Sequence, residues 1–478
     1  MNAVALSPLD AAFLEIEDAE PGVSMAIASI AVFAGPAPTT DEFARHLAGR
    51  LPLIPRYRQK VRRVPFDLGT PVWVDDPGFV LEHHLVRVAL PAPGGDAELA
   101  ALMGRVMATR LDRDRPLWRY WLVEGLAGGR WALISQVHHC LVDGVSGTDL
   151  YRVVLDPEPH PRPAAPETGE PAPEPSAGAL LLGAAGHLAA LPVALARAAG
   201  SLVTAPGRGA RAIAAGVQGA AALLGSLRPA RPSSLSGPLH RPRAFAIARG
   251  RVADVRAARH RYGGTFNDVV LAAVTAGFRD LLLARGEEPV PDLVRTLVPV
   301  SVRAPGDEGS RGNQVSLLLP RLPVHVADPA ERLAATITEL ETCKAEHEAE
   351  AGVLLTELAH YPPYALVAGG VRWASRTAQR AVVTVTTDVP GPRTTLYGLG
   401  RELEEIIPYV PVGSTLRIGV AILSYRDALV VGLTGDETAD DLDVLARGIE
   451  TELACLAHRR DDAGARRVSP GPPAPDGR

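Results

Sequence analysis

The sequence is poor in the residues that stabilise secreted or metal-bound domains. It has only three cysteines, Cys140, Cys343 and Cys455, which lie far apart and form no CxxC pair. A disulfide framework and a zinc knuckle are therefore not expected. The amino-terminal residues also lack a basic stretch followed by a long apolar core, so we do not expect a signal peptide. These absences predict a protein that is made and kept in the cytoplasm.

An excess of positive charge is also missing. The formal net charge is -5, the sequence pI is about 6.2, and the arginines are scattered along the chain. Such a surface does not attract a phosphate backbone, so nucleic acid is not expected as a partner. Aromatic residues make up only 5% of the chain, so its cores must be built mainly from Ala, Val and Leu.

The chain does contain enough apolar material for two domains. It has 478 residues, of which 47% are hydrophobic and 22% are charged, as in globular proteins. Helical and strand-like patterns fill residues 1–156 and 243–458, which we predict to be two α/β domains with mixed sheets. Residues 157–242 are predicted to link them, and residues 459–478, rich in Arg, Asp, Pro and Gly, to form a disordered tail.

The predicted linker changes composition along its length. It begins as a segment rich in Pro and Glu, which favours an extended chain, and continues as an Ala- and Leu-rich stretch over residues 176–227. No charged side chain occurs between Ser176 and Ala196, a length that would suffice to cross a bilayer. Glycines and Pro192 interrupt this stretch, however, so we favour a buried or surface-lying amphipathic helix over a membrane span.

Periodicity predicts helices and strands in both halves. Ser7 and Pro8 have the pattern of a capped helix start, and Asn267 or Asp268 is expected to cap a later helix. The segments 118–124 and 131–137 are separated by a Gly-rich stretch and predict a hairpin. Further helices are expected at 41–51, 99–107 and 269–283, and strands at 27–33, 295–302, 315–319, 382–387, 416–424 and 429–433.

The most informative segment directly follows the second hairpin strand. It places His138, His139, Asp143 and Gly144 in the spacing HHxxxDG. Side chains at the end of a strand are held by the sheet and face open space. A neutral imidazole there can accept the proton of an alcohol that attacks a carbonyl group, which accelerates such reactions by about 10²- to 10⁴-fold.

General-base catalysis is one of several roles that these residues could have. A zinc site would need a third ligand, and no HExxH motif or cysteine pair is near, so no metal is expected. Ser146 does not lie in a GxSxG elbow, which argues against a nucleophilic serine. On local features alone, His138 and His139 could also be structural histidines satisfied by the backbone, which is the default interpretation of His83 and His84.

The HHxxxDG spacing resembles the signature of the CoA-dependent acyltransferase superfamily. More narrowly, the chain resembles the bacterial wax ester synthase/diacylglycerol acyltransferase family. That resemblance rests on motifs that follow one another in the family's order over about residues 6 to 455: Leu6 to Phe13, Pro116 to Trp118, Thr265 to Leu271, Val298 to Arg303 with Gly312 and Asn313, Val389 to Pro392, and Leu396 with Tyr397. One such motif would be weak evidence, but the full set in register is specific.

The resemblance implies a fold and a set of roles. It implies two chloramphenicol-acetyltransferase-like domains, with the active site in a channel between them. His139 would be the general base, because it is the histidine of the shorter HxxxD pattern, and His138 would support it. Asp143 would orient the loop through an arginine, for which Arg303 is our candidate, and Gly144 would make the turn.

Five further residues are candidates for the substrate channel. Pro116, Leu117 and Trp118 could line an acyl groove, and Asn267 and Asp268 could shape the tunnel. Packing and capping would account for the same residues more simply, since an apolar strand start packs into a core and polar residues at a helix start cap it.

The chain departs from the family pattern at places that do not touch the base. Asp388 stands where relatives commonly have Asn, and the Asn often found before the Ser-Tyr pair of a late strand is absent. Pro21-Gly22-Val23-Ser24-Met25 replaces the usual Pro-Met-His. These differences could alter the channel, so the resemblance determines the reaction type more firmly than the acceptor.

The activity implied by the resemblance is the transfer of a long-chain acyl group from acyl-CoA to the hydroxyl of diacylglycerol, with long-chain alcohols as a second acceptor. No cofactor is expected, and acyl-CoA and the lipid acceptor would be the partners. The stretch 176–227 leaves attachment to a membrane or lipid-droplet surface open. Two rival functions remain: a natural-product acyltransferase or condensation enzyme with a carrier-bound donor, and a lipid-droplet-binding protein whose catalysis has decayed.

Overall fold

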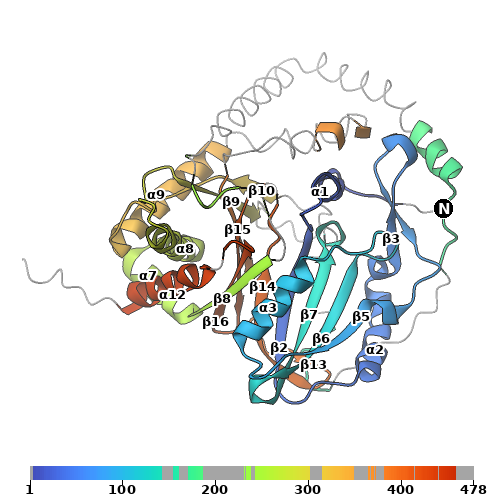
Figure 1. Ribbon diagram of the computed structural model, residues 1–478, viewed down its shortest axis with the longest axis horizontal. Helices are drawn as coiled ribbons and strands as arrows, with labels where there is room; N and C mark the ends of the chain where they lie inside the picture. Colours follow the sequence, from blue (N-terminus) through green and yellow to red (C-terminus); the bar gives the residue numbers. More distant parts are fainter. Residues whose placement is uncertain are drawn as a thin grey trace, which may run out of the picture.

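The computed structural model describes residues 4–142, 154–160, 171–186, 231, 233–237, 239, 243–301, 315–348, 364–365, 368–370, 372, 382–413, 415–439 and 441–458. Within them the chain forms two large sheets, one small sheet and the helices around them (Figure 1). Both large sheets combine parallel and antiparallel strands. The predicted mixed α/β architecture is therefore confirmed.

A six-stranded sheet organises the amino-terminal half. Its strands, in spatial order, are β13 (Tyr397–Gly398), β14 (Arg401–Tyr409), β2 (Ala26–Phe33), β7 (Arg130–His138), β6 (Trp118–Leu126) and β5 (Leu85–Ala89). β6 and β7 form the predicted antiparallel hairpin, and β5 runs parallel to β6. The helices of this half are α1 (Pro8–Ala19), α2 (Thr40–Ala48) and α3 (Asp96–Met107).

A small sheet and several short turns complete this half. The sheet has the order β1 (Val4–Ala5), β4 (Val72–Asp75) and β3 (Gln59–Arg62). The 3-10 turns are η1 (Leu51–Leu53), η2 (Pro55–Arg58), η3 (Pro65–Asp67), η4 (Leu81–His84), η5 (Ala127–Gly129) and η6 (His139–Leu141).

A seven-stranded sheet organises the carboxyl-terminal half. Its order is β10 (Val315–Leu318), β9 (Val294–Ser301), β12 (Thr384–Pro390), β15 (Ile418–Tyr425), β16 (Ala428–Asp436) and β8 (Arg243–Arg251), and β11 (Arg321–Leu322) also pairs with β9. The helices α7 (Val252–Tyr262), α8 (Phe266–Ala284), α9 (Pro329–Glu348) and α12 (Leu442–His458) lie together beside this sheet (Figure 1). Their apolar faces and the strands enclose a continuous buried core.

The two halves share strands and core. β14 comes from the carboxyl-terminal half of the sequence, yet it pairs antiparallel with β2 in the amino-terminal sheet. α3 packs on β8 so closely that a Cβ atom on Gly104 would lie 2.0 Å from the carbonyl oxygen of Arg243. A single buried cluster contains Ile30 from one half and Tyr425 from the other. The halves are therefore parts of one packed unit.

The first part of the Ala- and Leu-rich stretch forms a helix over residues 177–186. Leu182 on this helix is 76% exposed, whereas Ala184 is buried and packs toward Gly69. Just before the helix, Glu174 pairs with Lys60 at 3.0 Å and with Arg62. Among the described residues, no helix has the length and apolar character needed to span a membrane. The predicted tail and most of the predicted linker lie outside the described residues.

Candidate active site

The histidine pair lies where β7 ends and η6 begins. The backbone N–H of His138 donates to the carbonyl of Leu117 at 2.9 Å, and the N–H of His139 donates to the carbonyl of Met25 at 3.0 Å. Leu117 directly precedes β6, and Met25 directly precedes β2. The backbones at the ends of two neighbouring strands therefore fix the position of both histidines.

His138 is enclosed, with its side chain only 1% exposed. Its Nδ1 accepts the backbone N–H of Cys140 at 3.2 Å, so His138 caps the short turn that carries His139. Its Nε2 lies 3.2 Å from a carboxylate oxygen of Glu17 in α1. Burial lowers the pKa of His138 below its ordinary value of 6.5, although Glu17 opposes this change. We therefore take the ring to be neutral at neutral pH.

Glu17 is a buried carboxylate with several partners. Its Oε2 accepts the backbone N–H of Met25 at 2.7 Å, and its Oε1 lies 3.0 Å from the guanidinium of Arg113. Burial opposes its ionisation, but the contacts with His138, Arg113 and Met25 outweigh burial and lower the pKa of Glu17 below its ordinary value of 4.5. Glu17 is therefore ionised throughout the physiological pH range.

His139 has a different environment from His138. Its side chain is half-buried rather than enclosed. The ring of Phe13 in α1 stacks on the imidazole, with ring centroids 3.9 Å apart and an angle of 29° between the planes. One helix therefore contacts both histidines, through Glu17 for the first and Phe13 for the second.

α1 begins as the sequence pattern predicts. Ser7 is its N-cap, since its Oγ accepts the N–H of Asp10 at 3.1 Å and donates to the carboxylate of Asp10 at 2.8 Å. Pro8 occupies the first helical position, where its missing N–H costs no hydrogen bond. This start sets the register in which Phe13 and Glu17 face η6, against which the helix packs.

Cys140 lies between the motif residues but is not activated. Its side chain is buried, and its Sγ lies 3.0 Å from Nδ1 of His138. Burial, with the nearby carboxylate of Asp10, raises the pKa of the Cys140 thiol well above its ordinary value of 9.0. A thiol of this kind is a poor nucleophile.

Three of the predicted site residues, Asp143, Gly144 and Arg303, lie outside the described residues. Their predicted roles in orienting and turning the loop stay predictions.

The segment Pro116 to Trp118 lies in the core beside the histidine strand. Leu117 and Trp118 are fully buried, and the indole N–H of Trp118 donates to the carbonyl of Tyr57 at 2.8 Å. The ring of His84 stacks on Trp118, and its Nδ1 lies 2.8 Å from the carbonyl oxygen of Trp118. The structure thus places these residues in a stacked aromatic core, and His84 has the backbone partner expected of a structural histidine.

The start of α8 differs from the sequence prediction by a few residues. Thr265 is the N-cap, not Asn267 or Asp268, because the helix begins at Phe266. Thr265 accepts the N–H of Asp268 at 3.3 Å, and the carboxylate of Asp268 accepts the N–H of Thr265 at 2.6 Å. This is a reciprocal capping box, so Asp268 is buried in a structural role while Asn267 stays half-buried in the first turn.

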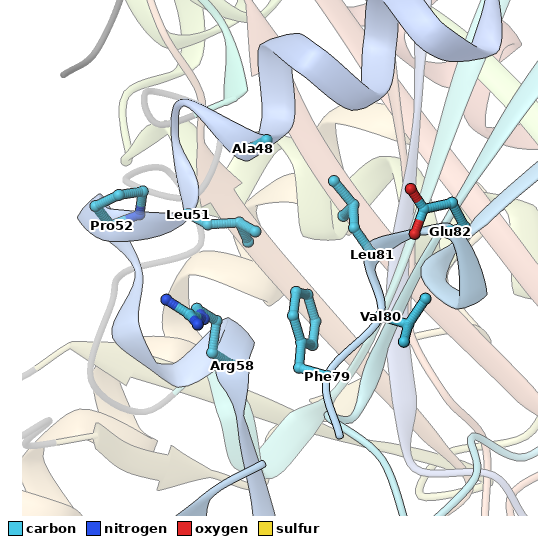
Figure 2. A pocket seen from close by; sticks show the side chains of 8 residues that line it. All are labelled: Ala48, Leu51, Pro52, Arg58, Phe79, Val80, Leu81 and Glu82. Carbon is cyan, nitrogen blue, oxygen red and sulfur yellow. The ribbon is translucent and has the colours of Figure 1, made fainter. Parts of the chain in front are cut away.

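A separate surface groove of about 440 Å³ lies beside the end of α2 (Figure 2). It is lined by Ala48, Leu51, Pro52, Arg58, Phe79, Val80, Leu81 and Glu82. Phe79 connects it to the core, since its ring stacks on His84 with centroids 5.3 Å apart. Neither His138 nor His139 lines this groove.

The pattern that defines a known protein family matches most of the chain. The family described as wax ester synthase/diacylglycerol acyltransferase catalytic domain matches residues 6–270, and the one described as WS/DGAT C-terminal domain matches residues 311–457. The chain belongs to the wax ester synthase/diacylglycerol acyltransferase (WS/DGAT) family. The predicted family is therefore confirmed, and the histidine pair lies within the part that matches the catalytic domain.

Similar proteins and solved structures support this assignment to the WS/DGAT family and show the wider fold. The chain is 41% identical over 453 residues to a probable diacylglycerol O-acyltransferase, tgs1, of Mycobacterium tuberculosis, covering 94% of this chain and 95% of the relative. It is similar to the solved structure of a WS/DGAT from Marinobacter aquaeolei VT8, with a TM-score of 0.62 and 26% identity over 95% of this chain and all of the other. A condensation domain of the calcium-dependent antibiotic synthetase, at 18% identity, shares the fold with a TM-score of 0.56, covering 96% of this chain and 97% of that domain.

The contacts between α1 and the histidines of this WS/DGAT member do not follow from the motifs alone. The motifs include Phe13 without giving it a role, and they do not include Glu17. A signal is present in the sequence, because Phe13 and Glu17 are four residues apart and therefore share one helix face. What the sequence does not show is that this face packs on a turn more than a hundred residues away.

Proposed function

We propose that this chain transfers a long-chain acyl group from acyl-CoA to the hydroxyl of diacylglycerol, with long-chain alcohols as second acceptors. Membership of the WS/DGAT family and the names of its relatives support this reaction. The single observation on which the chemistry depends is the half-buried imidazole of His139 at the end of β7, stacked on Phe13 and bonded through its backbone to Met25.

In the proposed mechanism His139 is the general base. It takes the hydroxyl proton of the acceptor while the hydroxyl oxygen attacks the thioester carbonyl. The C–O bond forms, the C–S bond breaks, and the proton passes to the departing thiolate to give free CoA. Base catalysis of this kind supplies about 10²- to 10⁴-fold, and positioning of the two substrates must supply the rest.

Direct transfer is favoured over a covalent acyl-enzyme. Within the turn η6, Cys140 is the only residue whose side chain has a thiol or hydroxyl group. Burial keeps that thiol protonated, so it cannot act as an activated nucleophile. The proposed reaction needs no metal or organic cofactor, because a thioester is already an activated acyl donor.

The remaining assignments follow from the family resemblance. We propose that Asp143 orients the loop through Arg303, that Gly144 makes the turn, and that the substrates meet in a channel between the two halves. Asn267, half-buried in the first turn of α8, stays a candidate for that channel. Four other candidates would support the channel only indirectly, by packing in the core or capping α8: Pro116, Leu117, Trp118 and Asp268.

We also propose that the protein works in the cytoplasm and attaches peripherally to a membrane or lipid-droplet surface, where its acceptor is dissolved. A lipid-facing patch, formed by Phe66, Leu68 and Leu182, supports this idea. Phe66 is 85% exposed, and Leu68 and Leu182 are 42% and 76% exposed. The contact between Gly69 and Ala184 places the two segments beside each other. Large apolar side chains gathered on a surface mark interaction sites.

The backbone of this patch is built to project Phe66. Phe66 and Asp67 both have positive backbone φ angles, 61° and 52°, which residues other than glycine rarely adopt. The carboxylate of Asp67 bonds the guanidinium of Arg372 at 2.5 Å, and Arg63 lies 3.5 Å away. These ion pairs hold the strained turn in place.

The reaction is tested with purified protein, palmitoyl-CoA and a panel of acceptors: diacylglycerols, long-chain alcohols and none. Free CoA and ester are measured together. We expect thiol release that depends on the acceptor and equals the ester formed. Thiol release that is the same without any acceptor would contradict the proposed function, and ester formation only with a carrier-bound donor would favour a condensation enzyme.

The lipid-facing patch is tested by flotation with triacylglycerol emulsions coated with phospholipid. Phe66→Ser with Leu68→Ser should reduce the bound fraction several-fold and leave the rate on a short-chain, water-dissolved substrate pair unchanged. Leu53→Ser is the control, since Leu53 is also 58% exposed but lies in η1. Equal binding of the double variant and the wild type would contradict the assignment of the patch.

A further inference from the structure

We propose that Glu17 is a positioning residue for acyl transfer, which holds His138 in the one tautomer that can cap the turn carrying His139. The proposal rests on the proposed role of His139 as the base. It gives a task to a buried carboxylate that, among the described contacts, does not touch the imidazole of His139.

The first step concerns the cap of η6. The N–H groups at the start of a helical turn have no partner within that turn and need an acceptor from outside. For Cys140 this acceptor is Nδ1 of His138, at 3.2 Å. Nδ1 can accept only while it carries no proton. The turn that presents His139 is therefore capped by only one of the two neutral forms of His138.

The second step concerns what selects that form. In the required tautomer the proton sits on Nε2, which is buried and lies 3.2 Å from Oε2 of Glu17 without the geometry of a regular hydrogen bond, so the carboxylate acts on it through its charge. An ionised carboxylate can only accept, so it favours a proton on the facing nitrogen. The other tautomer would turn a lone pair toward the carboxylate and an N–H toward the N–H of Cys140, with only the weak acceptor Sγ of Cys140 at 3.0 Å to take it. Glu17 thus disfavours the form that leaves η6 uncapped.

The third step concerns the charge and position of Glu17. Arg113, at 3.0 Å from Oε1, and the N–H of Met25, at 2.7 Å from Oε2, stabilise the ionised form. Met25 also connects Glu17 to the second histidine, because its carbonyl accepts the N–H of His139 at 3.0 Å. One carboxylate therefore contacts the ring of His138 and bonds the N–H of Met25, the residue whose carbonyl accepts the N–H of His139.

The size of the expected effect follows from this arrangement. In a catalytic triad, replacing the orienting carboxylate with an amide leaves the geometry intact but lowers turnover by about 10⁴-fold, because the histidine takes the wrong tautomer. Glu17 contacts His138 rather than the base His139 and so acts on the base indirectly. We therefore expect a smaller loss of turnover, about 10²-fold. Because the side chain of Glu17 is only 1% exposed and offers a substrate almost no surface, the loss should fall on kcat rather than on KM.

The test compares Glu17→Gln with Glu15→Gln on the full chain. Glu15 lies on the same helix, is also 1% exposed, and bonds the hydroxyl of Tyr364 at 2.8 Å, Arg63 at 2.8 Å and Arg372 at 2.5 Å. Both variants lose one buried charge, and only Glu17 faces His138. Glu17→Gln should lower kcat by about 10²-fold with KM within about threefold, while Glu15→Gln keeps kcat within about threefold at a similar loss of Tm.

The tautomer itself is read by NMR of the resting protein with ¹⁵N-labelled histidine, assigned with His138→Gln. Wild type should carry the proton on Nε2 of His138, and Glu17→Gln should shift the population toward Nδ1. A wild-type His138 protonated on Nδ1 would overturn the proposal without any Glu17 variant. Equal losses of kcat in both variants would also overturn it. A wild type without acceptor-dependent thiol release would instead refute the proposed function, while the tautomer assignment would still be tested by the spectrum.

Discussion

The ring of Phe13 lies face to face with the imidazole of His139, 3.9 Å away between centroids. A stacked pair of this kind is worth about 0.5–1.5 kcal/mol beyond the burial of its area. Phe13 therefore covers one face of the imidazole and restricts its orientation.

Phe13→Leu should therefore lower kcat by about 3- to 10-fold, since it keeps an apolar side chain but loses the flat ring. Steady-state kinetics with a fixed acceptor measure the change. Phe33→Leu is the matched control, because Phe33 stacks on Trp131 at 4.3 Å in the core of the same half. The control should lose stability but keep kcat. A Phe13→Leu enzyme with wild-type kcat would show that the stacking does not orient the base.

His139→Ala should lower turnover by at least about 10²-fold, as expected for loss of a general base. The side chain is half-buried and its backbone bond to Met25 is kept, so the fold should survive. Turnover is measured as acceptor-dependent release of CoA, with circular dichroism and Tm as checks on folding. Near-normal turnover in a folded protein would remove His139 from the mechanism.

Asp388 should make the protein less stable as the pH rises. Burial raises the pKa of Asp388 from 3.8 to about 6. A carboxyl with a raised pKa favours folding fully below pH 4, and this contribution is lost as the pH rises through about 6. Its ionisation at pH 8 should cost about 1–3 kcal/mol in the free energy of unfolding.

Asp388→Asn should therefore raise Tm at pH 8 and change it little at pH 4.5. Thermal unfolding at both pH values measures the difference. Glu437→Gln, at an exposed carboxyl in the same half, serves as control. The same pH dependence of Tm in wild type and Asp388→Asn would contradict the raised pKa and would mean that the Asp388 carboxyl is hydrated in solution.

Gly104→Ala should separate α3 from β8 and destabilise the protein. A methyl group at Gly104 would meet the carbonyl oxygen of Arg243 at 2.0 Å, and backbone atoms cannot rotate away. Overpacking of this kind costs about 1–3 kcal/mol or more. Gly183→Ala is the control, since that helical glycine has nothing within 4 Å and alanine favours the helix. Chemical denaturation compares the two, and a Gly104→Ala protein as stable as wild type would show that α3 and β8 separate freely.

Much of the fold could be predicted because local pattern determined it. The hairpin 118–124 and 131–137 corresponds to β6 and β7, and the capped start at Ser7 corresponds to α1. β14 escaped prediction, since its first residues, Arg401-Glu402-Leu403-Glu404-Glu405, carry four charges. Pairing with β2 and the burial of Leu403 and of residues 406–409 stabilise it as a strand.

The candidate site was predictable only in part. Local features left open whether His138 and His139 were structural. In the structure the two differ, because His138 is enclosed by partners and His139 is half-buried. The difference depends on Glu17 and Phe13, and no local window around residue 138 contains them. At α8 the spacing Thr265-x-x-Asp268 could have identified the true cap, since it has the form of a capping box.

The place of β14 beside β2 has a consequence for how the chain is synthesised. A ribosome that has made the histidine turn has still to add more than two hundred and fifty residues before Tyr409 emerges. Until then the edge of β2 has open N–H and C=O groups that another nascent chain could pair with. A gene fragment ending in the segment before Arg243 would leave this edge permanently open, so we expect it to aggregate when expressed alone and to be rescued by co-expression of the remainder.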